Sequence, residues 1–192
     1  GDETMRNAFI NGHDIHAATA ATVFGVDIEN VTPELRKRAK AVNFGIVYGI
    51  GEYSLSEDLG ISVAEAKRYI QNYLASFPKI SEYLDGIKQK AREDGYVCTE
   101  FGRKRYILEL TASNKNVQHF GERVAMNSPI QGSAADIIKI AMINVSRKLK
   151  ESGLDARLIL QVHDELLIEA RREDADKAAE ILQTEMENAV AL

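Results

Sequence analysis

Tryptophan is absent from the 192 residues of this chain, which also holds only three prolines and a single cysteine. Because Cys98 has no second cysteine to pair with, an internal disulfide and a metal site built from several cysteines are both excluded. No apolar run approaches the ~20 residues that a helix needs to cross a bilayer, so we expect no membrane partner. An excess of basic residues is also missing. The net charge is −5, so any nucleic-acid partner would have to bind a local basic surface.

The two ends of the chain lack the signals of a complete secreted or membrane protein. Residues 1–4 have neither the basic nor the apolar region of a signal peptide. The chain has no initiating methionine, and it stops on the apolar residues 189–192. We therefore expect both ends to be cuts in a longer protein, and the lone cysteine fits a cytoplasmic location.

The spacing of apolar and turn-forming residues predicts an α+β fold, mainly helical with a small antiparallel sheet. Besides the helix that begins at Pro33, helices are expected over residues 17–24, 54–59, 63–77, 78–93 and 172–189. Residues 116–152 are also expected to be helical, with a break near Pro129 and Gly132. Strands are expected over residues 96–99, 105–108, 157–162 and 165–169.

The helix that begins at Pro33 carries an unusual exposed pattern. Arg36, Lys40, Phe44 and Tyr48 follow one another at intervals of four residues, which places them on one helix face. This face has two cations at one end and two aromatic rings at the other, along about 18 Å at ~1.5 Å per residue. Such a face suits a ligand with a polyanionic tail and a flat ring, such as a nucleoside triphosphate. The spacing alone is equally consistent with a solvated basic face and core aromatics.

The opposite face of the same helix has the spacing of a core contact, with apolar side chains at Leu35, Ala39, Val42 and Ile46. Thr32 is a suitable N-cap and Pro33 a suitable first-turn residue. The glycines that follow, at Gly45, Gly49 and Gly51, either end the helix or allow another element to approach the backbone closely.

Two further groups of polar residues could bind a ligand. His163, Asp164 and Glu165 interrupt two apolar strands, and carboxylates exposed at such a turn could bind a divalent cation, although hairpin turns favour polar residues in any case. Side chains at i, i+4 and i+8 could read acceptors in a DNA minor groove or form an ordinary solvated face; these are Arg123, Asn127 and Gln131.

The order and spacing of these residues resemble family A DNA polymerases of the DNA polymerase I type. The segment Arg36-x-x-x-Lys40-x-x-Asn43-Phe44-Gly45-x-x-Tyr48-Gly49 resembles the nucleotide-binding helix of the fingers. Gln161-Val162-His163-Asp164-Glu165 resembles the palm motif. Four shorter segments follow the family's order: Asp14-Ile15-His16, Ser76-Phe77-Pro78, Phe101-Gly102-Arg103-Lys104-Arg105-Tyr106 and Asn127-x-Pro129-x-Gln131-Gly132.

The resemblance implies a partial polymerase domain over residues 1–192, truncated at both ends. Approximately residues 14–95 would form the helices of the fingers. Approximately residues 96–192 would form the rest of the fingers and part of the palm. The implied reaction is template-directed addition of deoxynucleotides to a primer 3′ end with Mg²⁺, in the bacterial cytoplasm at the nucleoid. The implied partners are primer–template DNA and deoxynucleoside triphosphates; the oligomeric state is left open.

The resemblance also implies roles for single residues. Lys40 would meet the triphosphate and help to protonate the leaving pyrophosphate, while Arg36 holds the γ-phosphate and His16 adds a phosphate contact. Phe44 would press on the sugar and Tyr48 would stack near the templating base.

The remaining roles concern DNA and metal. Asp164 would bind the metal ion with Glu165 as a weaker catalytic neighbour, and His163 would orient the primer end. Phosphate contacts would come from Arg103, Lys104 and Arg105, and minor-groove contacts from Arg123, Asn127 and Gln131.

One departure from the family pattern concerns catalysis. The family uses a second palm aspartate in an Asp-Tyr-Ser-x-x-Glu-like strand, and no such segment occurs in these residues. We therefore expect the isolated chain to be inactive. The main alternative is a non-catalytic module that binds nucleic acid or nucleotides. A His-Asp-Glu metal hydrolase is a more distant alternative, because further ligands are missing.

Overall fold

The computed structural model describes residues 2–12 and 14–191, so the two ends of the expected domain, Gly1 and Leu192, lie outside the described residues. The chain divides into two compact units. The first unit comprises Gly1–Cys98 and Lys104–Ser128, and the second comprises Thr99–Arg103 and Pro129–Leu192. Helix α7 (Lys115–Ser152) contributes to both units.

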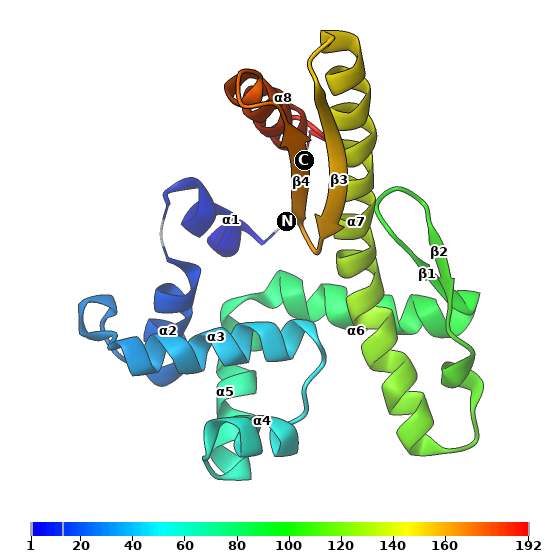
Figure 1. Ribbon diagram of the computed structural model, residues 1–192. Coiled ribbons are helices and arrows are strands. Elements are labelled where there is room, and N and C mark those ends of the chain that lie inside the picture. Colours follow the sequence, from blue (N-terminus) through cyan, green and yellow to red (C-terminus); the bar gives the residue numbers. More distant parts are fainter. Residues whose placement is uncertain (1, 13, 192) are drawn as a thin grey trace. The chain divides into compact units, whose positions relative to one another are not determined.

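The first unit is built mainly from helices (Figure 1). Its elements are α1 (Glu3–Ile10), α2 (Ile15–Phe24), the 3-10 helix η1 (Ile28–Asn30), α3 (Pro33–Val47), α4 (Glu52–Leu59), α5 (Val63–Ser76), α6 (Pro78–Asp94), β1 (Tyr96–Cys98), β2 (Lys104–Tyr106), the 3-10 helix η2 (Leu108–Thr111) and the first part of α7. Helix α1 was not expected from the sequence. The 3-10 helices η1 and η2 were not expected either, and the remaining helices and strands confirm the expected order to within a few residues.

Helix α3 confirms the sequence-based expectation closely. The Thr32 hydroxyl accepts a hydrogen bond from the Leu35 amide at 3.3 Å, and Pro33 occupies the first turn. The core face is buried at Ala39, Val42 and Ile46. Val42 and Ile46 join a core cluster with α2, α4, α5, α6 and the first part of α7; its other buried members are Val23, Leu55, Ala66, Tyr73, Phe77, Leu84 and Met126.

The glycines after α3 serve both purposes that the sequence allowed. The helix ends at Val47, and Gly49 has a φ of 71°, which a residue with a Cβ rarely adopts. A Cβ on Gly49 would lie 2.3 Å from Met126 Cε and 3.0 Å from Arg123 Cγ. Helix α7 therefore approaches the backbone here as closely as only glycine permits.

The expected helix break at Pro129 and Gly132 was wrong, because α7 continues through both positions. A proline removes one backbone donor, and a long helix can continue past it. Gly132 serves packing instead, since a Cβ there would lie 2.5 Å from Thr99 Cγ2. The division between the two units nevertheless falls at Pro129.

The second unit packs an antiparallel hairpin against two helices. Strands β3 (Ala156–Val162) and β4 (Glu165–Ala170) pack through one face with α8 (Ala175–Glu187) and the later part of α7 (Figure 1). The buried core of the unit consists of Ile138, Ala141, Val145, Leu149, Leu166 and Ala178. Because β1 pairs with β2 and β3 with β4, the described residues hold two separate two-stranded sheets, where the sequence suggested one. The α+β class is confirmed.

Candidate nucleotide and nucleic-acid site

The four residues of the α3 stripe lie on one exposed helix face. Phe44 is 48% exposed and Tyr48 is 43% exposed, while Lys40 and Arg36 are exposed one and two turns before Phe44. The two rings are nearly parallel, with centroids 6.4 Å apart and planes inclined by 18°. Solvent-facing aromatic rings at this spacing leave their faces accessible to a flat ligand.

The start of α2 lies beside this stripe. The carboxylate of Asp14 caps α2, accepting from the amides of His16 at 3.0 Å and Ala17 at 3.3 Å. The cap places the imidazole of His16 5.9 Å from the Phe44 ring, centroid to centroid. Residues that are more than twenty positions apart in the sequence therefore form one surface.

The two cations of the stripe have different surroundings. Arg36 Nε donates to the second carboxylate oxygen of Asp14, and this hydrogen bond holds the pKa of Asp14 below its usual value. In the described part of the chain, Lys40 has no acidic partner within ion-pair range, and its ammonium lies 5.8 Å from the centroid of the Phe44 ring. Lys40 is therefore the cation whose charge is least compensated.

Asn43 belongs to the nucleotide-binding pattern of α3, but no role for it was predicted. It is 9% exposed, its Nδ2 lies 2.8 Å from His16 Nδ1, and its Oδ1 accepts from the Thr19 hydroxyl at 3.1 Å. Desolvation lowers the pKa of His16, an effect that Asp14 opposes and the neighbouring cations reinforce. An amide on the buried side of an amphipathic helix was the available signal for this contact.

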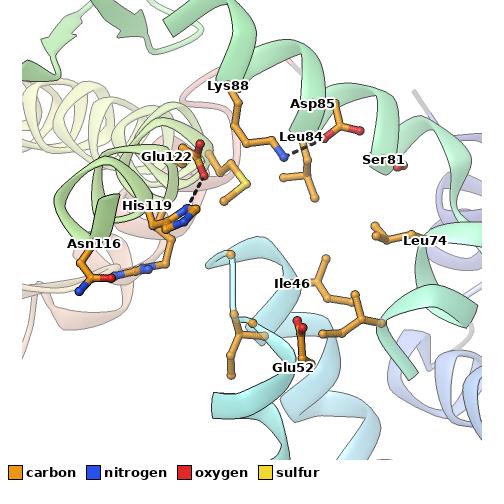
Figure 2. Close-up of a pocket in the computed structure, with 16 residues that line it drawn as sticks. Ile46, Glu52, Leu74, Ser81, Leu84, Asp85, Lys88, Asn116, His119 and Glu122 are labelled. Carbon is orange, nitrogen blue, oxygen red and sulfur yellow. Dashed lines mark hydrogen bonds and ion pairs between the residues drawn. The ribbon is translucent and has the colours of Figure 1, made fainter. Parts of the chain in front are cut away.

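Two cavities adjoin the end of α3 within the first unit. One, of about 570 Å³, lies beside Phe44 and Tyr48 and is lined by Gly45, Gly49 and Ser54 among others. The other, of about 880 Å³, has an apolar floor that includes Ile46, Leu74 and Leu84 (Figure 2). Its polar rim carries an ion pair, Lys88 with Asp85 at 2.7 Å, and a hydrogen bond between His119 Nδ1 and Glu122 Oε2 at 3.2 Å.

The basic segment Arg103 to Arg105 does not behave as a uniform cluster. Arg103 Nε and Nη2 donate to Asp136 Oδ1 at 2.7 and 2.6 Å, and Thr99 donates to Asp136 Oδ2 at 2.8 Å. Asp136 is buried, and these hydrogen bonds lower its pKa. Lys104 lies 4.2 Å from the centroid of the Tyr96 ring, and Arg105 is exposed. Arg103 therefore holds its own loop on α7. The exposed charges of this segment that remain for a ligand are those of Lys104 and Arg105.

The polar residues of α7 differ from one another in burial. Arg123 is exposed, with its guanidinium 5.8 Å from the Phe120 ring centroid. Asn127 Oδ1 is buried, and nothing within residues 2–12 and 14–191 donates a hydrogen bond to it. Gln131 is exposed in the second unit. A buried amide oxygen without a donor is uncommon, and a hydrogen-bonding ligand would satisfy it.

The tip of the β3–β4 hairpin presents His163, Asp164 and Glu165 to solvent. His163 has a φ of 52°, which is uncommon for a residue other than glycine, and its carbonyl accepts from Gln161 Nε2 at 2.8 Å. Carboxylates are suitable ligands for Mg²⁺, but nowhere among the described residues do three His, Cys, Asp or Glu side chains group to hold a metal ion. The tip therefore presents two carboxylates, the kind of ligand that Mg²⁺ prefers. The helices of the described chain include none that is both long and apolar enough to span a membrane.

The model of DNA polymerase family A matches residues 1–192, and the chain belongs to this family.

The chain is similar over its full length to several bacterial proteins named DNA polymerase I. It is 58% identical to the protein of Caldicellulosiruptor bescii, 51% to that of Geobacillus stearothermophilus and 52% to that of Bacillus subtilis. It spans 22% of the length of each of these relatives. A solved structure described as the POL domain of Pol1 from M. smegmatis, in complex with DNA primer-template and dNTP, is 45% identical and superposes with a TM-score of 0.92. The superposition covers all of this chain and 34% of that one.

Proposed function

We propose that this chain is the part of a DNA-directed DNA polymerase that binds the incoming deoxynucleoside triphosphate and contacts the primer–template. The observation that carries the proposal is the exposed stripe of α3, where cations and stacked rings follow one another beside His16. The names of the relatives, and the DNA and dNTP in the similar solved structure, support the same assignment.

The stripe suggests how a nucleotide would bind. Lys40 would contact the phosphates with an uncompensated charge and stand close enough to help protonate the pyrophosphate, while Arg36 binds the γ-phosphate with its remaining donors. His16 would add a phosphate contact. Phe44 would pack on the sugar and Tyr48 near the templating base, next to the 570 Å³ cavity.

The DNA contacts would come from residues outside this stripe. Lys104 and Arg105 would contact phosphates together with Arg103, whose exposed guanidinium also binds Asp136. Arg123 would face the minor groove beside the two amides of α7, and the unpaired Oδ1 of Asn127 supports this role for it. His163 would orient the primer end. Gln131 would contribute the remaining minor-groove contact.

The metal chemistry would require ligands beyond this chain. When bound, Mg²⁺ would supply charge neutralisation for phosphoryl transfer, held by Asp164 with Glu165 beside it. A second carboxylate opposite Asp164 is needed for a two-ion arrangement, and the sequence lacks the family's second aspartate. The 192 residues would therefore bind substrates without catalysing extension by themselves. The alternative is a module whose role is binding alone.

The two segments predicted from the sequence would form parts of a polymerase domain in this proposal. The helices of about residues 14–95 would belong to the fingers, and residues of about 96–192 would comprise the rest of the fingers and part of the palm. The whole enzyme would act on chromosomal DNA, in the cytoplasm at the bacterial nucleoid.

Titration of a deoxynucleoside triphosphate against the wild type and Lys40→Ala tests this proposal. A charge-assisted contact contributes ~1.5–3 kcal/mol when well shielded, and exposure reduces this, so we expect affinity to fall by about threefold to tenfold. Lys67→Ala is the matched control, because it removes the same charge from an exposed position on α5. Equal losses in both variants would remove Lys40 from the phosphate role.

Inorganic triphosphate separates the two halves of the stripe. Phe44→Ala should weaken binding of the nucleotide but leave binding of inorganic triphosphate unchanged, because only the nucleotide has a sugar and a base to pack on the ring. If the wild type bound both ligands equally well, the aromatic half of the stripe would have no part in recognition.

A further inference from the structure

A buried chain of hydrogen bonds runs beneath the proposed phosphate site. The Thr19 hydroxyl donates to Asn43 Oδ1 at 3.1 Å, and Asn43 Nδ2 lies 2.8 Å from His16 Nδ1. Thr19 is fully buried and Asn43 is 9% exposed, whereas the His16 ring is half-buried at the edge of the stripe. The three side chains thus connect the interior between α2 and α3 to the surface where the cations lie.

The direction of these bonds determines where the His16 proton can be. A hydroxyl that donates to Oδ1 sets the orientation of the amide, so Asn43 turns its NH₂ group toward the imidazole. An amide NH₂ can only donate, so Nδ1 must be the unprotonated, accepting nitrogen of a neutral ring. The remaining proton then sits on Nε2. A neutral ring also agrees with the lowered pKa of His16, because burial disfavours the charged form; Asp14 opposes this effect, and Arg36 and Lys40 add to it.

We propose that Asn43, oriented by Thr19, is a positioning residue that holds His16 as the Nε2–H tautomer and so presents a fixed hydrogen-bond donor to the nucleotide phosphates. This inference rests on the proposed nucleotide-binding function. It adds that the donor is preset by a buried amide before the ligand arrives, which reduces the ordering needed on binding.

The ring chemistry can be measured without any nucleotide. Long-range proton–nitrogen correlation spectra of the imidazole distinguish the two neutral tautomers and the cation, and the His16→Ala variant identifies the relevant signal. We expect the Nε2–H form in the wild type. Asn43→Asp keeps the size of the side chain but replaces the donor with an acceptor, so its ring should carry a proton on Nδ1.

Control variants distinguish a change in the His16 tautomer from a general disturbance of the fold. Asn30→Asp makes the same chemical change at an exposed position and should leave the His16 signal unchanged. Thr19→Val removes the hydroxyl with little change of shape, and it should broaden or mix the tautomer signals because the amide is no longer oriented. A wild-type Nδ1–H ring, or an Nε2–H ring that persists in Asn43→Asp and Thr19→Val, would overturn the proposal.

A double-mutant cycle then links the ring to the ligand. Asn43→Leu should weaken deoxynucleotide binding by about threefold to tenfold in the wild-type background and by less than about twofold in His16→Ala. An equal loss in both backgrounds would mean that Asn43 acts through general packing, and would refute the positioning role. If the tautomer signature is as expected but neither the wild type nor Lys40→Ala binds nucleotide, the proposed function fails while the assignment of the ring stands.

Discussion

The close contact between Gly49 and α7 leads to the most direct prediction about the free energy of unfolding. Gly49 lies directly after Tyr48, and its φ of 71° turns the chain away from the end of α3. Replacing it by alanine introduces two separate penalties. The backbone must keep a conformation that a Cβ disfavours, and the new methyl must share space with Met126 and Arg123.

The magnitude follows from the two penalties taken separately. A left-handed backbone costs a residue with a Cβ about 1–2 kcal/mol. The methyl would lie 2.3 Å from Met126 Cε, but this atom ends a flexible side chain, so the overpacking cost belongs near the lower end of the usual range of about 1–3 kcal/mol. We expect Gly49→Ala to lower the free energy of unfolding by about 2–3 kcal/mol.

Two other glycines separate the penalties. Gly25 has a φ of 69° and open space around its Cα, so Gly25→Ala should show the backbone penalty alone, about 1–2 kcal/mol. Gly86 lies inside α6, with no positive φ and no atom within 4 Å of a new Cβ. Gly86→Ala should stabilise the protein by about 0.5–1 kcal/mol, because alanine favours a helix interior.

Urea unfolding followed by circular dichroism measures all three variants against the wild type. The expected order of stability is Gly86→Ala, wild type, Gly25→Ala and then Gly49→Ala. A Gly49→Ala protein within about 0.5 kcal/mol of the wild type would refute both the turn geometry and the close approach of α7. A loss equal to that of Gly25→Ala would refute the contact with α7 alone.

Four further predictions concern ligands and pH. In a longer, active polymerase of this family, Phe44→Tyr should relax discrimination against dideoxynucleotides, since its hydroxyl can replace a contact of the missing 3′-OH; unchanged incorporation ratios would contradict this. DNA should bind this chain without sequence preference and much more weakly as salt rises, and neutralising Lys104 and Arg105 should reduce the salt slope; a flat salt response would argue against phosphate contacts. Primer extension by the 192 residues should be undetectable with Mg²⁺ or Mn²⁺, and extension that Asp164→Ala abolishes would disprove the need for a second carboxylate. Burial raises the pKa of Tyr73 to about 12, above its ordinary 10.0, so the folded state keeps a proton that the unfolded state loses; stability should be full below pH 10 and fall as pH rises toward 12, and Tyr73→Phe should remove this dependence.

The sequence alone was sufficient for features that depend on neighbouring residues. The Thr32 cap, the buried face of α3 and its exposed stripe all follow from hydrogen bonds and side-chain periodicity within a few positions. The two hairpins and most helix bounds were predictable for the same reason. Helix α1 was missed even though Asp2 caps it by accepting from the Met5 amide, because its apolar pattern is short.

Contacts between distant positions were decided only by the tertiary structure. Asn43 is 27 positions from His16, and Asp136 is 33 positions from Arg103, so no local sequence pattern predicts either hydrogen bond. The structure thereby made Asn43 part of the site and gave Arg103 a carboxylate partner. It also showed that α7 continues past Pro129 and that Gly132 accommodates Thr99. Local periodicity determines which helix or strand face a residue occupies. Only the packing of the elements determines which group that residue contacts.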